Sequence, residues 1–362
     1  MWLVVALAGC SPFEPPITEE DASFEPVDGD DASVQDAEAS VEAGDDASVD
    51  TGVPDAAAPA DANVADADAG AGVDAGPDAS VMIPRRPTLA KCGFAAPAAL
   101  GTVTEPGLNE VSGIAASRRN PRVVWVNEDS GNGAVVHALN DQGTLVASYG
   151  LSGNALDYED IAVGPGPEPG VSYLYVADIG DNNGSRANVV IYRAPEPEVL
   201  WNQARISATL AQVTPFPMRY PEGARNAEAF MVDVNQDFYL VTKDGFTRPN
   251  NVYRLPAPQQ ATVQRTLELV TSVYGGTGTD VSITSGDINA DGSRIILRSL
   301  HAATHWTRAS GATIDETLRN VTPCDAELAN ESKGESISFG ATGYFTISEG
   351  TGTPLHFVSF TP

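Results

Sequence analysis

Residues 84–362 alternate apolar and polar positions in short runs that are bounded by Gly, Asn, Asp and Pro. The runs are rich in β-branched and aromatic residues, and a period of two is typical of half-buried strands. No long stretch repeats apolar residues at the spacing of three and four that an amphipathic helix needs. The pattern therefore predicts an all-β domain.

One type of segment recurs five times in this domain, with an acidic or small residue followed by an alternating apolar run. The segments are residues 110–116, 158–164, 226–233, 285–291 and 334–340. Aligned on Gly113, Asp160, Ala229, Asp287 and Ser336, they are separated by 47, 69, 58 and 49 residues. A period near 50 with several strands in each repeat indicates a β-propeller.

Further strands follow each of these segments. Second strands are expected at 123–126, 173–177, 238–242, 294–298 and 343–347, and third strands at 135–139, 189–193, 251–255, 305–307 and 355–358. Fourth strands are expected at 144–149, 209–213 and 266–270, and more weakly at 316–319. We predict five blades, with six as the alternative because the 69-residue interval has room for another blade.

The fifth repeat ends at Pro362 after only three strands. Its missing outer strand is expected from the start of the domain, around Thr102, so that the ring closes without a long open edge. Cys92 and Cys324 lie near opposite ends of the domain and are plausible disulfide partners in an oxidising compartment, with two buried free thiols as the alternative.

Charge divides the chain into two parts. The whole chain has 49 Asp and Glu against 20 Lys and Arg, a net charge of -29. Residues 11–83 hold 20 of the acids and no base, and they repeat Asp-Ala-Ser-Val at 31–34, 46–49 and 78–81. So charged and so poor in aromatic residues, this segment cannot bury enough apolar surface to fold. We therefore expect a disordered, extended linker. The excess of acidic residues also argues against a nucleic-acid-binding protein, which needs clustered Lys and Arg to neutralise phosphates.

The first ten residues form a short apolar run that ends in Leu7-Ala8-Gly9-Cys10. This resembles a bacterial lipobox, in which the Cys becomes the lipidated N-terminus of the mature protein. The resemblance implies a signal peptide at 1–10, lipidation of Cys10 and a place in the bacterial cell envelope, in the outer membrane by the sorting rule for Ser11. Contact with the membrane would be through this lipid anchor alone, because no apolar run is long enough to cross a bilayer.

The predicted propeller brings many carboxylates to one mouth of its central channel. First strands begin there and second strands end there, so acidic residues at both kinds of position should converge. We take eight of them as candidate ligands of a divalent cation: Glu159, Asp160, Asp178, Asp181, Glu228, Asp287, Glu335 and Glu349. Glu110, Glu128 and Asp129 occupy similar positions.

Crowded carboxylates raise one another's pKa unless a cation lies among them, and all-oxygen ligands favour Ca²⁺ or Mg²⁺. We therefore predict Ca²⁺. The alternative is that these carboxylates accept backbone hydrogen bonds from neighbouring blades and only lock the ring. Asp287 also begins a partial EF-hand pattern, but position 12 of that pattern is Arg298, so a hairpin turn is the simpler interpretation.

Several short motifs together resemble the phytase-like and NHL-like families of secreted bacterial propellers. They are Asn127-Glu-Asp-Ser-Gly, Asp157-Tyr-Glu-Asp-Ile-Ala, Asp178-Ile-Gly-Asp-Asn-Asn, Ala227-Glu-Ala-Phe and Gly334-Glu-Ser-Ile. In the calcium-dependent phytases, mouth carboxylates hold Ca²⁺ and basic residues orient phosphate. The resemblance implies that Glu159, Asp160, Asp178, Glu228 and Glu335 bind metal and that Lys243 and Arg298 contact the substrate.

Three hypotheses for the function follow. The first is a monomeric, lipid-anchored propeller that binds an unidentified ligand or protein partner, with a cation at its mouth. The second is a calcium-dependent phosphoesterase or another hydrolase, such as a glycosidase that uses two of the ring carboxylates. The third is a purely structural envelope protein. No nucleophile elbow, zinc-protease helix or phosphate-binding loop is present to add another catalytic scheme.

Overall fold

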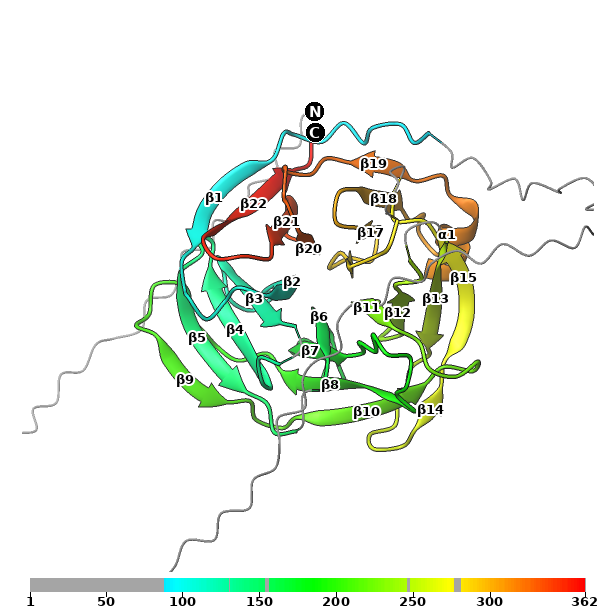
Figure 1. The fold of residues 1–362 in the computed structure, drawn as a ribbon, viewed down its shortest axis with the longest axis horizontal. Coiled ribbons are helices and arrows are strands. Elements are labelled where there is room, and N and C mark those ends of the chain that lie inside the picture. The colour runs from blue at the N-terminus through cyan, green and yellow to red at the C-terminus, as the bar shows by residue number, and fades with distance from the viewer. Residues whose placement is uncertain (1–87, 130, 154–155, 246–247, 277–280, 362) are drawn as a thin grey trace, which may run out of the picture. The chain divides into compact units, whose positions relative to one another are not determined.

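The computed structural model describes residues 88–129, 131–153, 156–245, 248–276 and 281–361. Five β-sheets surround a central axis, and the inner strands of each sheet are antiparallel (Figure 1). Cys10 and the linker 11–83 lie outside the described residues, so their lipidation and disorder stay predictions. Among the helices that the structure describes, none is long and apolar enough to span a membrane.

Blades 1 and 2 each have five strands. Blade 1 runs outward from the axis as β2 (Val111–Ala116), β3 (Val123–Glu128), β4 (Val135–Asn140), β5 (Leu145–Gly150) and β9 (Ile206–Thr209). Blade 2 consists of β6 (Tyr158–Pro165), β7 (Ser172–Asp178), β8 (Val189–Pro195), β10 (Thr214–Arg219) and β14 (Arg265–Thr266).

The other three blades have four strands each. Blade 3 contains β11 (Ala227–Val232), β12 (Phe238–Thr242), β13 (Asn250–Leu255) and β15 (Glu268–Val273). Blade 4 contains β16 (Ser285–Ile288), β17 (Arg294–Arg298), β18 (Ala303–Thr307) and β19 (Cys324–Ala326). Blade 5 contains β20 (Gly334–Phe339), β21 (Gly343–Ser348), β22 (Thr353–Ser359) and, from the start of the domain, β1 (Ala98–Val103).

The five-bladed prediction is confirmed, and the six-bladed alternative is wrong for the described residues. The long interval between the second and third repeats holds β9, which leaves its own blade and pairs in parallel with β5 of blade 1. In the same way β14 pairs in parallel with β10 of blade 2. These two short strands extend neighbouring sheets instead of building another blade.

The predicted ring closure is also confirmed. Strand β1 pairs antiparallel with β22, so the beginning and the end of the propeller share one sheet. Figure 1 shows the cyan β1 beside the red β22. Just before β1, Cys92 forms a disulfide with Cys324 of β19, which ties the closing segment to blade 4 as well.

Two of the predicted outer strands were wrong. Residues 209–213 begin at the last residue of β9, and the fourth strand of blade 2 is β10. The segment 316–319 lies in helix α1 (Ile314–Asn320), and the fourth strand of blade 4 is β19. Thr313 and Glu316 form a capping box at the start of α1, a sequence signal that could have identified the helix.

The core lies between the blades. The innermost strands β2, β6, β11, β16 and β20 contact one another around the ring, and apolar side chains fill each wedge between adjacent sheets. Between blades 2 and 3, for example, Phe238 packs edge-on against Tyr175, Phe216 and Phe230. This packing holds the starts of the innermost strands close together at one mouth of the channel.

Candidate functional site

A β-bulge begins the innermost strand of four blades. One residue in each of these strands has no partner in the register, namely Ser112, Glu159, Glu228 and Glu335. A bulge re-aims the side chain of its extra residue. Three glutamates at equivalent bulges are thereby brought to the same mouth, as the sequence predicted for these three residues.

Lys243 follows β12 and lies among these glutamates. Its Nζ is 2.5 Å from Oε2 of Glu228. Burial opposes the charge of Lys243, but the nearby carboxylates of Glu228, Glu335 and Glu159 raise its pKa overall. Burial raises the pKa of Glu228 to about 7, against the opposing effect of Lys243. Burial likewise raises the pKa of Glu335.

A tighter carboxylate cluster lies next to this group. One oxygen from each of Asp129, Asp157 and Glu159 lies within 4.8 Å of the others. Glu159 is only 3% exposed, and its pKa is raised well above the ordinary value by burial and then by Glu228 and Asp129. Burial, followed by the charge of Asp129, raises the pKa of Asp157 to about 6.

Two further features of this cluster concern space and hydrogen bonding. A Cβ on Gly180 would lie 2.2 Å from Oε1 of Glu159 and 2.4 Å from Cγ of Asp157, so only glycine allows both carboxylates to approach here. Oδ1 of Asp157 is buried and has no hydrogen-bond partner among the described residues. The cluster therefore contains a carboxylate oxygen that a cation could satisfy.

Asp178 and Asp181 support the loops around this cluster. Asp178 pairs with Arg186 at 2.8 Å and accepts hydrogen bonds from the backbone N–H of Asp157 at 3.1 Å and of Leu156 at 3.4 Å. Asp181 accepts the N–H of Ser185 and of Arg186, both at 2.9 Å. Their carboxylates are thus engaged in positioning the chain, including the loop that carries Asp157.

Asp160 follows the alternative that the sequence left open. It is fully buried, and its oxygens accept the N–H of Ile161 at 2.9 Å, of Phe230 at 3.0 Å and of Gly286 at 3.3 Å. One carboxylate therefore links the innermost strands of blades 2, 3 and 4. With its hydrogen-bonding capacity used in this way, Asp160 locks the ring instead of facing a cation.

Asp287 lies away from the mouth cluster. Unlike the other blades, β16 has no bulge at its start. Ser285 takes the position of Asp160, because its side chain accepts the N–H of Ile337 as Asp160 accepts that of Phe230. Asp287 lies two residues further along the strand, where it accepts the N–H of Phe339 at 2.8 Å and the hydroxyl of Ser338 at 2.9 Å. The alignment of Asp287 with Asp160 was therefore wrong by two residues.

Arg298 is not placed to contact a substrate. It is 0% exposed, pairs with Glu331 at 2.8 Å and donates to the backbone oxygen of Ser336 at 3.0 Å. The sequence placed it correctly at the end of a second strand, but its guanidinium is buried between blades 4 and 5. Lys243 is the one member of the predicted substrate pair that stays beside the mouth carboxylates. Glu349, at the end of β21, pairs with Lys333 at 3.0 Å.

Asp129 and Asp157 were left out of the predicted ligand set. Asp129 comes directly after β3 and had been noted as the end of a second strand, whereas Asp157 precedes β6 by one residue. The motif Asp157-Tyr-Glu-Asp was visible in the sequence. The sequence did not predict Asp157 as a ligand, because the direction of a side chain just before a strand does not follow from the strand pattern.

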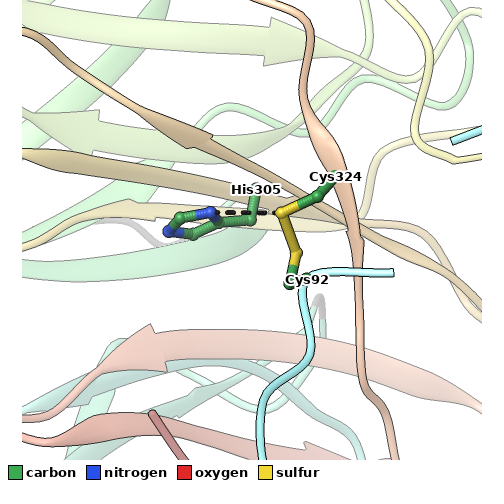
Figure 2. A group of neighbouring side chains, drawn as sticks. All are labelled: Cys92, His305 and Cys324. Atoms are coloured by element: carbon green, nitrogen blue, oxygen red, sulfur yellow. Dashed lines mark hydrogen bonds between the residues drawn. A yellow bond between two sulfur atoms is a disulfide. The ribbon is translucent and has the colours of Figure 1, made fainter. Parts of the chain in front are cut away.

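A second group of metal-ligating residue types lies at the outer rim. Figure 2 shows Cys92 and Cys324 joined as a disulfide, with Nδ1 of His305 3.6 Å from Sγ of Cys324. Sulfurs that are bonded to each other are not thiolates and do not serve as metal ligands. In the part of the chain that is described, the cluster of Asp129, Asp157 and Glu159 is therefore the better candidate metal site.

Comparisons with known proteins identify no family and only structures of low similarity. No protein-family model and no curated protein matches the sequence. A structure of soluble aldose sugar dehydrogenase from Escherichia coli, in the apo-form, is similar with a TM-score of 0.39 and 8% identity over 74% of this chain and 100% of that chain. A catalytically inactive virginiamycin B lyase from Staphylococcus aureus, with quinupristin, has a TM-score of 0.37 and 9% identity over 72% of this chain and 98% of that chain.

Proposed function

We propose that this protein is a lipid-anchored module of the bacterial cell envelope that binds Ca²⁺ at the channel mouth and uses the metal-bound face to bind a ligand or partner. The convergence of Asp129, Asp157 and Glu159 within 4.8 Å carries the proposal. A hard divalent cation prefers carboxylate oxygens. It would offset the burial and, after it, the repulsion between carboxylates that raise the pKa of Asp157 and Glu159.

The surroundings of the cluster suit such a role. Glu228 and Glu335 lie near it and share the charge of Lys243, so they need no second cation. The ammonium group of Lys243 is half-buried and could meet an acidic group of a ligand that also contacts the metal. Anchoring through Cys10 and the linker 11–83 would hold this face away from the membrane; both lie outside the described residues.

The experiment is calorimetric titration of Ca²⁺ into the purified protein, together with thermal unfolding in Ca²⁺ and in chelator. We expect one binding event and a stabilisation of about 2.7 kcal/mol at a hundredfold excess over the dissociation constant. Asp157→Asn should weaken binding at least about tenfold, because it removes one ligand charge. Asp291→Asn is the matched control, since Asp291 lies in an exposed turn.

The pH dependence of binding gives an independent check. Because the pKa values of Asp157 and Glu159 are raised, Ca²⁺ must displace protons, and its affinity should rise as the pH increases from about 5 to 7. Absence of heat, or a shift in melting temperature that Asp157→Asn does not alter, would contradict the proposed site.

A calcium-dependent phosphoesterase is the second candidate. Lys243 beside the carboxylates favours it, and the burial of Arg298 weakens it. It predicts hydrolysis of p-nitrophenyl phosphate that depends on Ca²⁺ and is lost in Lys243→Met. Calcium binding without hydrolysis would leave the binding module as the function.

A further inference from the structure

A cavity lies at the outer rim between blades 3 and 4, far along the sheets from the channel mouth. It has a volume of about 320 Å³ and lies among β15, β18, α1 and the segment after α1. Figure 1 shows α1 next to β15 at this rim. Apolar side chains that line it include Leu89, Val273, Leu318 and Pro323.

Two of the polar side chains that line this cavity are deeply buried. Thr304 and Trp306 lie two residues apart on β18, so they share one face of the strand. They are 1% and 3% exposed, and neither Oγ1 of Thr304 nor Nε1 of Trp306 has a hydrogen-bond partner among the described residues. Leaving such a group unpaired destabilises the folded protein.

The other deeply buried indole in the fold shows what such a group normally finds. Nε1 of Trp125 donates to the Glu196 carboxylate at 2.9 Å. Trp306 has no such carboxylate partner among the described residues, and the cavity wall around it mixes aliphatic side chains with the polar Ser272, Asn320 and Thr322. The wall thus combines apolar side chains with a hydroxyl donor and an indole donor that have no hydrogen-bond partner among the described residues.

We propose that this cavity is a binding site for a small, neutral, largely apolar molecule that carries a carbonyl oxygen. The carbonyl would accept from Trp306 Nε1–H and Thr304 Oγ1–H, and the apolar body would lie against Val273 and Leu318. A charged group is disfavoured, because Arg319 at the rim already donates to the backbone oxygen of Val270 at 2.5 Å and 3.1 Å and an unpaired charge would lose its hydration.

The test compares two probes of the same shape. Acetophenone has the carbonyl, and α-methylstyrene has a methylene in its place. Binding of each to the purified protein is measured by saturation-transfer NMR and by quenching of tryptophan fluorescence. We expect acetophenone to bind at least about fivefold more tightly than α-methylstyrene, in keeping with one to two hydrogen bonds.

Variants then identify the site. Thr304→Val keeps the shape and removes the hydroxyl, so it should raise the melting temperature of the empty protein and weaken acetophenone binding about fivefold. Trp306→Phe should also weaken binding and abolish the fluorescence response. Thr307→Val, on the exposed face of the same strand, is the control and should change neither measurement.

Three results would overturn this proposal: no binding of acetophenone to the folded protein, equal binding of the two probes, or unchanged acetophenone binding in Thr304→Val and Trp306→Phe with intact melting transitions. The site does not involve the channel mouth. Its failure and the failure of calcium binding are therefore separate outcomes.

Discussion

Buried carboxylates have two different roles in this molecule, and local hydrogen bonding separates them. Asp160 and Asp287 accept backbone N–H groups from neighbouring blades, so they replace hydrogen bonds that a sheet would otherwise make. Asp157 has a buried oxygen without such a donor among the described residues. All three residues are aspartates. Only the hydrogen-bond donors around each carboxylate distinguish one that locks the ring from a candidate metal ligand.

Replacing Asp160 tests the first role. In Asp160→Ala, the N–H groups of Phe230, Ile161 and Gly286 lose their acceptor inside the core. Each buried donor left unpaired costs about 1–3 kcal/mol, so we expect the free energy of unfolding to fall by about 3 kcal/mol or more. Urea denaturation followed by circular dichroism measures it. The matched change Asp291→Ala, in an exposed turn, should cost under about 1 kcal/mol.

His137 gives a pH-dependent prediction. Burial, followed by the charge of Arg205, lowers the pKa of His137 from 6.5 to about 4. In the unfolded chain the imidazole gains a proton near pH 6.5, but the folded protein resists protonation until about pH 4. The stability that depends on neutral His137 is therefore complete above pH 6.5 and is lost as the pH falls toward 4.

The measurement is the difference in unfolding free energy between the protein and His137→Gln from pH 7 to pH 4. As the pH falls from 7 to 4, we expect the unsubstituted protein to lose up to about 3 kcal/mol of unfolding free energy relative to His137→Gln. Raised carboxyl pKa values act in the opposite direction, but they cancel in the comparison. A flat difference for His137→Gln would contradict the assignment.

At the scale of elements, the inner three strands of every blade were predictable from sequence and the outer ones were less so. Inner strands are buried on both faces, and their apolar runs leave little choice of structure. Outer strands are short and half-exposed, so local capping and long-range pairing decide them. The capped helix α1 replaced one predicted strand, and β9 and β14 joined the sheets of preceding blades.

The bulges were invisible in the sequence pattern. They occur in β2, β6, β11 and β20 but not at the start of β16. An alignment that assumes five equivalent strands therefore brings Asp287 to the mouth, whereas the structure places it further along the channel. In this blade Ser285 occupies the position that Asp160 has in blade 2, and the nearest acidic residue, Asp287, lies two positions further along. An alignment on acidic residues therefore moved this one strand by two positions.

At the scale of the whole molecule, the ring depends on joining its two ends. Strand β1 completes the sheet of blade 5, and the Cys92–Cys324 disulfide links the preceding segment to blade 4 across 232 residues of chain. In the chain-entropy account, a cross-link that closes so long a loop stabilises the folded state by about 5 kcal/mol, mainly by restricting the unfolded chain.

Reduction tests this contribution. With a dithiol reductant present, the free energy of unfolding in guanidinium chloride should fall by about 5 kcal/mol, while the far-ultraviolet circular dichroism of the native state remains that of the β-propeller. The double variant Cys92→Ser, Cys324→Ser should unfold at the same denaturant concentration as the reduced protein and should not respond to reductant. An unfolding midpoint that reduction leaves unchanged would refute the expectation.

The sequence by itself determined the repeat, the propeller architecture, the closing strand and the general place of Glu159, Glu228 and Glu335, whereas the structure decided between five blades and six. Periodicity and strand composition are local properties that are repeated five times, so each repeat supports the others. Tertiary structure alone decided which carboxylates meet. Asp129 and Asp157 come together with Glu159 because loops of two blades meet beside Gly180, whereas Arg298 is buried against Glu331 from the adjoining segment. Such contacts depend on distances between blades, and no pattern along a single chain contains those distances.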